Sequence, residues 1–384
     1  MIHDLGGTLR ACTPEQTLQK LQPLLLDVFG ITRIADITGL DTIGIPVSIC
    51  IRPNSKVLST AQGKGITAEL ARISAIMESI EAWHAERIIG EVIYSSYDEL
   101  AKITPLPRID HLMQSFISYP DVCSRSLPWL KVYDLMQQKF SYLPFALISL
   151  DTTAIRVGQE LFMGTSNGLA GGNTLEEAIC HGLQECIERD CIAEFERLSD
   201  EEKSQRRVRL ASIDSMHNQA LIARIHHAGF KLYVFEATNR FKVSCFYAEV
   251  DDEDSVRGLG AFSGFGAHLS REVALSRAIS EAVQSRLTII SGTRDDIMPK
   301  FYHQNSARHS GYEEKEHLDY ALCHSDPVPT TFKACIDLLL SKLQQQAIQQ
   351  VLMYDHTRPE LDIAIANVIV PELDFEWRSH RMIT

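Results

Sequence analysis

Apolar and polar residues alternate with a period of two in several short stretches, which is the pattern of a β-strand with one buried face. The clearest case is residues 42–52, where Ile43, Ile45, Val47 and Ile49 occupy every second position. Comparable apolar stretches recur along the chain between polar, glycine or proline residues. We expect strands over residues 31–38, 42–52, 131–134, 141–150, 231–237, 243–250, 351–354 and 363–370.

Other stretches carry apolar residues every three or four positions, which predicts helices with an inward face. The expected helices cover residues 14–29, 67–87, 213–227, 272–292 and 330–346, with a further helix that starts at Thr174. Thr67 is the expected N-cap of the second helix. Three glycine-rich segments, at residues 62–65, 164–172 and 258–266, are expected to be turns or loops.

Several of the expected strands follow one another without a helix between them, which argues against a purely doubly wound parallel sheet. The pattern therefore predicts an α+β fold (mixed α/β), with sheets flanked by helices. The densely charged residues 201–209 are expected to lie on the surface and to mark an internal boundary near residues 200–210.

Three of the expected helices share a pattern of acidic residues. In each, an alanine is followed by an acid seven positions later and by an acid or amide three positions further on, so that all three lie on one helix face. The three sets are Ala71, Glu78 and Glu81; Ala178, Glu185 and Glu188; and Ala274, Glu281 and Gln284. The residues between them are largely apolar, and carboxylates beside a core require a cation. Mg²⁺ ions and the phosphates they carry are the natural partners.

An isolated acidic pair on a helix more often faces solvent, where lysines balance it. Here no lysine occurs between residues 71 and 87 or between residues 174 and 197, which favours a shared site. The segment 168–173 ends where a helix starts and could receive a phosphate, but it is neither a Walker loop nor a Rossmann fingerprint, and a tight turn is the simpler interpretation. Lys64 is either a phosphate contact or a solvated turn residue. His84 and His181 receive no role.

Composition narrows the class of protein. The chain has 384 residues, 45% of them hydrophobic, enough for a substantial core, and its formal net charge of -13 disfavours binding to nucleic acid or to an anionic membrane. Nine cysteines without paired spacing indicate buried thiols in a reducing compartment rather than a zinc site. The start lacks a secretion signal, and no apolar run reaches the length of about 20 residues that spans a bilayer. We expect a cytoplasmic protein.

With these residues in view, the chain closely resembles the YcaO family of ATP-dependent enzymes that modify peptide backbones. The resemblance rests on three signatures and extends from end to end. Ser74, Glu78 and Glu81 are similar to the first signature, Asn173 with Glu177, Glu185 and Glu188 to the second, and Glu281, Gln284 and Arg286 to the third. It implies a single YcaO-type catalytic domain over residues 1–384, with an ATP site built from the three acidic helices.

The resemblance also implies the cofactors ATP and Mg²⁺. It assigns metal binding to Glu78, Glu81, Glu177, Glu185, Glu188 and Glu281, and ATP binding to Arg10, Ser74, Asn173, Arg189, Gln284 and Arg286. In the family's chemistry a nucleophile adds to an amide carbonyl, ATP phosphorylates the oxygen, and phosphate leaves. Phosphoryl transfer of this kind depends on positioning and on charge neutralisation by metals and arginines. The general base is not assigned.

The nucleophile decides the product: a Cys, Ser or Thr of the substrate gives an azoline ring, sulfide a thioamide, and an amine an amidine. Residues 7–18 and 52–55 resemble the branch that works with a TfuA-like partner, and residues 379–384 lack the proline-rich tail common in ring-forming members. We therefore expect backbone thioamidation of a peptide or protein. The alternatives are an azoline-forming cyclodehydratase of a ribosomal peptide and a non-catalytic nucleotide-binding accessory in a sulfur-transfer or maturation complex.

The expected partners follow from the same resemblance. They are a peptide or protein substrate, a TfuA-like or other peptide-recognition protein, and a second copy of the chain in a homodimer. Nucleic acid and membrane are not expected.

Overall fold

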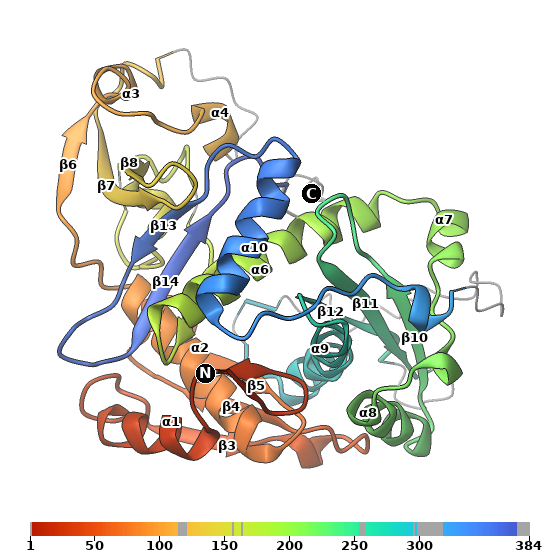
Figure 1. Ribbon diagram of the computed structural model, residues 1–384. Coiled ribbons are helices and arrows are strands. Elements are labelled where there is room, and N and C mark those ends of the chain that lie inside the picture. The colour runs from red at the N-terminus through yellow and green to blue at the C-terminus, as the bar shows by residue number, and fades with distance from the viewer. Residues whose placement is uncertain are drawn as a thin grey trace. The chain divides into compact units, whose positions relative to one another are not determined.

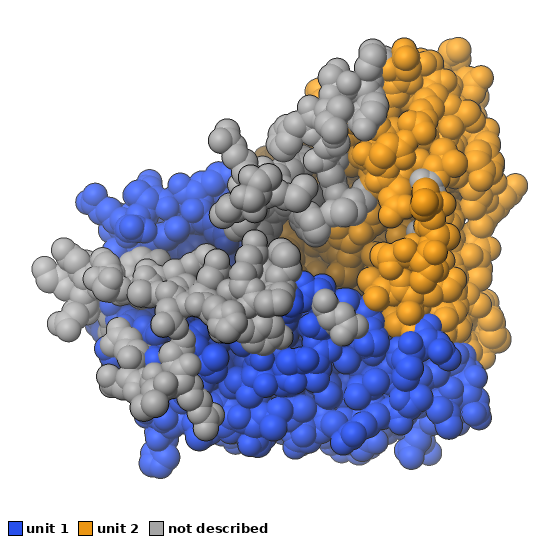
Figure 2. Space-filling model, turned by 180° about the vertical axis from the view of Figure 1, so that it is seen from behind, with its two compact units in different colours: residues 1–54, 58–79, 191–331 blue, residues 55–57, 80–190, 332–384 orange. Residues whose placement is uncertain are grey.

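The computed structural model describes residues 2–113, 121–155, 157–162, 164–252, 259–294, 296–297 and 318–374 (Figure 1). The chain divides into two compact units (Figure 2). Unit 1 comprises Met1–Asn54, Leu58–Ser79 and Cys191–Thr331, and unit 2 comprises Ser55–Val57, Ile80–Asp190 and Phe332–Thr384. The tail at residues 379–384, on which part of the thioamidation argument depends, lies outside the described residues.

Unit 1 contains two three-stranded antiparallel sheets, each of which leads into one of the acidic helices. The first part of the chain supplies β1 (His3–Asp4), β2 (Leu9–Arg10), α1 (Pro14–Leu21), η1 (Gln22–Leu24), β3 (Arg33–Asp36), η2 (Thr38–Leu40), β4 (Val47–Ile51), β5 (Thr60–Lys64) and the start of α2 (Ala68–Ala85). The second part supplies α7 (Asp200–Gln205), η3 (Leu210–Ser212), α8 (Met216–His227), β10 (Lys231–Glu236), β11 (Ser244–Asp251), β12 (Phe262–His268), α9 (Arg271–Ser291) and η5 (Tyr320–Leu322). One apolar core joins both parts, since side chains of β4 pack with those of α8, β10, β11 and α9.

Unit 2 is built on one six-stranded sheet in the order β6-β7-β13-β14-β9, with β8 paired to β7. Its elements are the end of α2, β6 (Val92–Ser95), α3 (Tyr97–Leu100), α4 (Ile109–Leu112), β7 (Leu127–Asp134), β8 (Lys139–Pro144), α5 (Phe145–Ile148), β9 (Leu169–Gly172), α6 (Leu175–Glu196) up to Asp190, α10 (Phe332–Gln345), β13 (Leu352–Asp355) and β14 (Ala364–Ile369). Within each unit, every pairing between named strands is antiparallel. The predicted α+β fold, as opposed to a doubly wound parallel sheet, is confirmed.

Helix ends follow the capping signals of the sequence. Thr67 caps α2, because its hydroxyl oxygen accepts a hydrogen bond from Leu70 N at 3.2 Å. Ser270 caps α9 in the same way, and Gly292 ends that helix in the left-handed conformation, with φ of 57°. The helix expected over residues 14–29 stops at Leu21 and continues as the 3-10 turn η1, because Pro23 has no N–H to donate.

Two groups of expectations were wrong. The three glycine-rich segments, expected as turns or loops, overlap the strands β5, β9 and β12, although residues 164–168 do form a loop as expected. The strand expected over residues 141–150 ends at Pro144, after which α5 begins. Proline has no N–H group to donate to a neighbouring strand, which accounts for the end of the strand at Pro144.

The chain does not pass between the units at residues 200–210, where charge density suggested a boundary. Those residues form the short helix α7 and its neighbours inside unit 1, and the crossings fall at residues 54–58, 79–80, 190–191 and 331–332. The charged residues serve instead to cap and solvate α7, whose N-cap Ser199 and Glu202 exchange hydrogen bonds. The interpretation of residues 1–384 as a single catalytic domain stays a prediction.

Among the described helices, none combines the length and the apolar character needed to cross a bilayer.

Candidate functional site

Each acidic helix packs against the strand that precedes it through a contact between glycine and alanine. A side-chain carbon added at Gly63 of β5 would lie 2.4 Å from the carbonyl oxygen of Ala71, and one at Gly266 of β12 would lie 2.2 Å from that of Ala274. At Gly172 of β9 it would lie 2.7 Å from the nitrogen of Ala178. Only hydrogen fits between strand and helix backbones this close. The alanine that opens each acidic repeat is therefore a packing residue, and the acids follow it along the helix.

In unit 1, Glu281 of α9 is held by a lysine from the neighbouring sheet. Its Oε2 atom lies 2.5 Å from Lys64 Nζ on β5, and its Oε1 atom lies 3.5 Å from Phe265 N. Both side chains keep contact with solvent, at 27% exposure for Glu281 and 21% for Lys64. Lys64, left open between phosphate contact and solvated turn, thus sits in a strand and binds a predicted metal ligand.

Glu78 is exposed on the part of α2 that belongs to unit 1. Burial raises the pKa of the Cys50 thiol to about 11, and the Glu78 carboxylate adds to this rise. The same carboxylate contributes to the raised pKa of Arg294, whose main partner is Asp296. Glu78 therefore carries its charge near the end of the first sheet. Ser74 and Gln284 are half-buried on their helices.

In unit 2, three predicted residues meet where β9 turns into α6. Glu81 Oε1 accepts a hydrogen bond from Gly171 N at 2.6 Å. Glu177, which is buried, accepts hydrogen bonds through Oε2 from Asn173 N at 3.1 Å and Asn173 Nδ2 at 3.3 Å. Backbone N–H groups thus orient both carboxylates through charge-assisted hydrogen bonds, and the bonds of Glu177 also cap the start of α6.

Two further acids lie about two and three turns beyond Glu177 on α6. Glu185 pairs with Arg189 at 3.6 Å across one helical turn, and Glu188 is buried. Arg189, predicted to meet phosphate, is therefore already beside a carboxylate of the same helix face.

Arg286, predicted to contact the nucleotide, pairs with two carboxylates within unit 1. Its side chain is buried, with Nε 3.0 Å from Asp41 Oδ2 and Nη2 3.2 Å from Asp252 Oδ2. The guanidinium also lies over the ring of Phe230, 4.7 Å from its centroid. The one guanidinium contacts two carboxylates, so Arg286 ties the turn after η2 and the end of β11 to α9. Its role in ATP binding stays a prediction.

Arg10 lies on β2, in a hairpin that packs on α9. A side chain at Gly7 would lie 2.7 Å from Ser276 Oγ, so the hairpin contacts the helix at its first turns. His268, at the end of β12, accepts a hydrogen bond at Nδ1 from Ser270 N at 2.8 Å, which places the proton of the neutral ring on Nε2. Burial, then the charges of Arg277 and Arg10, lower the pKa of His268 to about 3. Sequence reasoning assigned no role to His268 or Arg277.

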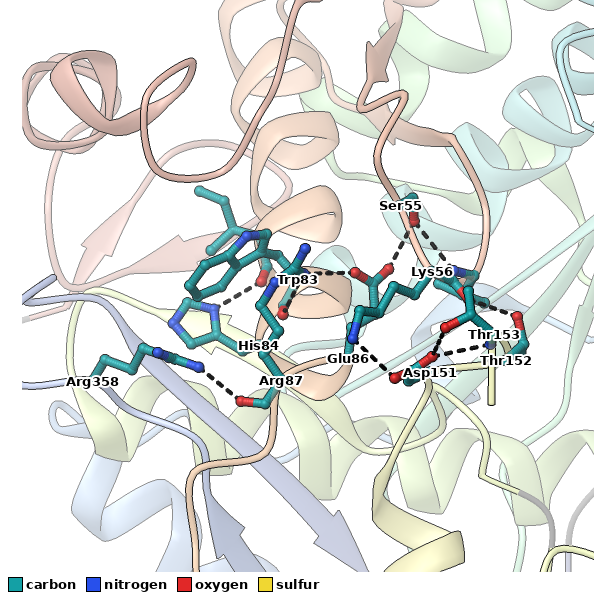
Figure 3. Close-up of polar contacts among 12 residues, drawn as sticks. Ser55, Lys56, Trp83, His84, Glu86, Arg87, Asp151, Thr152, Thr153 and Arg358 are labelled. Carbon is teal, nitrogen blue, oxygen red and sulfur yellow. Dashed lines mark hydrogen bonds and ion pairs between the residues drawn. The ribbon is translucent and has the colours of Figure 1, made fainter. Parts of the chain in front are cut away.

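The far end of α2 is anchored by a buried network within unit 2 (Figure 3). The side chain of Glu86 is fully buried and accepts hydrogen bonds from Ser55 Oγ at 2.7 Å and Arg87 Nη1 at 2.8 Å. Trp83 lies between two guanidinium groups, 4.9 Å from that of Arg87 and 4.7 Å from that of Arg358. The helix that carries Glu81 is thus fixed at its C-terminal end, and sequence reasoning assigned no role to Glu86, Arg87 or Arg358 in this.

The carboxylates suit a magnesium ion that arrives with a nucleotide. Within the part of the chain that the structure describes, no three His, Cys, Asp or Glu side chains are gathered as a metal cage. Mg²⁺ is bound in proteins by one or two carboxylates together with substrate phosphates, rather than by an all-protein cage. The exposed Glu78 and the partly exposed Glu281 fit that requirement, since each can reach a ligand from solvent.

Sequence comparison identifies the family. Residues 62–374 match the sequence model of the family described as YcaO cyclodehydratase, ATP- and Mg²⁺-binding. A protein of Rhizobium leguminosarum bv. trifolii, named for its position in the tfuA 3' region and otherwise uncharacterized, is 33% identical over 96% of this chain and 89% of its own length. An uncharacterized protein of Methanothermobacter thermautotrophicus is 31% identical over 95% of each chain.

Solved structures share the fold. The structure of YcaO from Methanopyrus kandleri bound with AMPPCP and Mg²⁺ has a TM-score of 0.75 at 20% identity, and the match covers 96% of this chain and 93% of that one. A heterocyclase in complex with substrate and cofactor has a TM-score of 0.76 at 22% identity, and this chain spans 53% of its length. The Escherichia coli microcin synthetase McbBCD complex with pro-MccB17 bound has a TM-score of 0.64 at 17% identity, covering 88% of each chain.

Proposed function

Because the chain belongs to the YcaO family, which binds ATP and Mg²⁺, we propose that it phosphorylates a peptide backbone amide on oxygen so that sulfur can replace that oxygen. The product is a backbone thioamide in a peptide or protein. A TfuA-like protein serves as the partner in this reaction.

One observation carries the choice of thioamidation. The relative that is 33% identical over almost the whole chain is named for a gene position beside tfuA. The match covers 96% of this chain and 89% of the relative, so the likeness is not confined to the catalytic signatures. That relative therefore supports a shared partner as well as a shared fold.

The reaction balances as follows. A sulfide sulfur adds to the carbonyl carbon, and the resulting oxyanion takes the γ-phosphoryl group of ATP, which breaks the bond between the γ-phosphorus and the bridging oxygen and releases ADP. The C–O bond then breaks, phosphate leaves, and loss of the sulfur-bound proton forms C=S. Bound Mg²⁺ neutralises the phosphate charge that develops in this transfer.

The residues that we propose to hold Mg²⁺ are Glu78, Glu81, Glu177, Glu185, Glu188 and Glu281. Backbone N–H groups orient Glu81 and Glu177 beforehand, so these two carboxylates lose little conformational freedom when a ligand binds. The residues that we propose to contact the nucleotide are Arg10, Ser74, Asn173, Arg189, Gln284 and Arg286.

The decisive experiment combines the purified protein with a TfuA-like partner, a peptide substrate, ATP, Mg²⁺ and a sulfide source. Intact-mass analysis should show a gain equal to the exchange of oxygen for sulfur, dependent on ATP. A matched reaction with AMPPCP in place of ATP should leave the peptide unchanged.

A second function is favoured by the solved structures. The heterocyclase and the microcin synthetase are fold neighbours, so an azoline-forming cyclodehydratase is the alternative within the same chemistry. Its product would lose one water, a mass change of opposite sign. A third candidate, a non-catalytic accessory of a sulfur-transfer or maturation complex, would bind ATP without substrate-dependent release of phosphate.

The setting of the protein is part of the proposal. We expect it to act in the cytoplasm as a homodimer, apart from nucleic acid and membrane. Sedimentation of the purified protein and fractionation of the source cells test these two points.

A further inference from the structure

The ion pair between Lys64 and Glu281 places an ammonium on a carboxylate assigned to metal binding. Lys64 Nζ and Glu281 Oε2 are 2.5 Å apart, although the two residues are 217 positions apart in the sequence. Both belong to unit 1, and neither side chain is fully buried. The pair is thus a close contact that solvent, and any solute, can reach.

The fold fixes both ends of this pair. Gln62, two residues before Lys64 on the same face of β5, is buried and accepts a hydrogen bond from Thr288 Oγ1 of α9. A side chain at Gly65 would lie 2.7 Å from Ala71 N, so the chain after Lys64 is pressed against α2. The lysine therefore projects from a strand fastened on both sides, and its contact with Glu281 follows from the packing of β5 on α9.

A lysine in this position competes with a metal ion for the carboxylate. Free Mg²⁺ would have to displace the Lys64 ammonium from Glu281. The ion would then lie close to that ammonium, and repulsion between two positive charges at contact distance is costly. A nucleotide offers phosphate oxygens that the ammonium can bind instead, because lysine is a mobile point charge with three donors. The lysine is therefore released from Glu281 most easily when phosphate arrives together with the metal.

We propose that Lys64 is a removable counter-ion of Glu281 that makes metal binding depend on nucleotide. Without nucleotide, Lys64 occupies Glu281 and weakens binding of a divalent cation alone. With nucleotide, Lys64 turns to a phosphate and frees Glu281, so the two ligands bind cooperatively. This inference rests on the proposed function only for the assignment of Glu281 to the metal.

Mn²⁺ binding followed by electron paramagnetic resonance tests the inference. In the absence of nucleotide, Lys64→Met should bind Mn²⁺ about tenfold more tightly than wild type, since one contacting positive charge is removed. In the presence of AMPPCP the difference should vanish or reverse, because the same lysine then supports phosphate. Lys64→Arg, which keeps the charge, should behave like wild type.

Two further variants separate the mechanism from general effects. Lys333→Met removes an exposed lysine that pairs with Asp337 on α10, and its Mn²⁺ affinity should equal that of wild type. Adding Lys64→Met to Glu281→Gln should change Mn²⁺ affinity no further, because the carboxylate through which the lysine acts is gone. Denaturation curves confirm that each variant is folded.

Equal or weaker Mn²⁺ binding by folded Lys64→Met without nucleotide would overturn the inference. So would an equal gain from Lys64→Met in the Glu281→Gln background. Failure of the wild-type protein to bind AMPPCP would overturn the proposed function and the nucleotide-dependent half of the inference together, whereas a failed metal-only comparison in a protein that binds AMPPCP would overturn the inference alone.

Discussion

At the scale of single residues, the glycines of β5, β9 and β12 decide how closely the acidic helices approach their strands. A side-chain carbon at Gly264 would lie 2.2 Å from Ala282 N and 2.5 Å from the carbonyl oxygen of Ala278. These neighbours are backbone atoms, which cannot move aside without shifting the helix. The position of Glu281, which stands between these two alanines on α9, thus depends on a hydrogen atom at residue 264.

Gly264→Ala should therefore destabilise the protein by about 3 kcal/mol, the upper part of the range for overpacked cores. Gly39→Ala is the matched control, because nothing lies within 4 Å of a side-chain carbon there. Its free energy of unfolding should stay within about 0.5 kcal/mol of wild type. Urea unfolding measures both values. Equal stability of the two variants would show that strand and helix can separate without cost.

Two buried histidines should make the protein sensitive to acid. Burial lowers the pKa of His84 to about 4 and that of His356 to about 3, with the nearby Arg358 adding to both shifts. The unfolded chain binds these protons near the ordinary histidine pKa of about 6.5. The contribution of these neutral histidines to the free energy of unfolding is complete above pH 6.5 and is lost as the pH falls toward 4. At pH 5 the loss should be about 2 kcal/mol per histidine.

Free energies of unfolding measured at pH 7 and pH 5 test whether stability falls with acid as expected. The fall between the two values should be smaller in His356→Gln than in wild type, because one buried titrating group has been removed. His227→Gln changes an exposed histidine at the end of α8 and should keep the wild-type fall. An identical fall in all three proteins would contradict the assignment, since carboxylates titrate alike in each.

At the scale of elements, the sequence predicted the helices that carry the acids but not what surrounds them. The bounds of α2 and α9 agree with expectation to within two residues, because Thr67 and Gly292 mark their ends chemically. The hydrogen-bond and ion-pair partners of several proposed site residues are distant in the sequence. Arg286 and Asp41 are 245 positions apart, and no local pattern encodes such a contact. The glycine-rich strands β5, β9 and β12 are expected as turns from the sequence, because composition does not distinguish a glycine that permits a bend from one that lets a helix backbone lie close to a strand.

The anchor at the end of α2 should contribute to stability through Glu86. Replacing Glu86 by glutamine keeps its shape and removes the charge that balances Arg87, which should cost about 2 kcal/mol. Asp337→Asn is a matched change in an exposed pair with Lys333 and should cost less than about 1 kcal/mol. Thermal or urea unfolding compares the two. A cost for Glu86→Gln no larger than the control would mean that Ser55 and Arg87 do not need the charge.

Arg286 joins three elements, and lysine cannot reproduce its fork. Arg286→Lys should lower the free energy of unfolding by about 3 kcal/mol, because a point charge cannot contact Asp41 and Asp252 together and stack on Phe230. Titration of the folded variant with AMPPCP and Mg²⁺ separates this effect from the proposed nucleotide contact. The loss of binding free energy for the nucleotide should be smaller than the loss of free energy of unfolding. Full stability with a large loss of affinity would assign Arg286 to the ligand instead.

At the scale of the whole molecule, neither unit corresponds to one continuous stretch of chain. Unit 1 draws on residues before 80 and after 190, and a single apolar core contains Ile45, Val47 and Ile49 from the first part and Ala274, Ala278 and Ile279 from the second. Each part alone would expose the face that the other covers. Buried apolar area is the main source of stability, so the two parts should fold together or not at all.

Separate expression of residues 1–190 and residues 191–384 tests this dependence. Each fragment should lack a cooperative unfolding transition, because the strands β3, β4 and β5 and the helix α9 then lose the core they share in unit 1. Mixing the two fragments should restore a transition and the near-ultraviolet circular dichroism of the full chain, since the missing apolar contacts re-form on association. The variant pair Val47→Ala and Val57→Ala supplies the control, because Val47 is in the shared core and Val57 is exposed. Only Val47→Ala should weaken reassembly of the two fragments. A fragment of residues 191–384 that unfolds cooperatively by itself would show that the second sheet and α9 suffice as a folding unit.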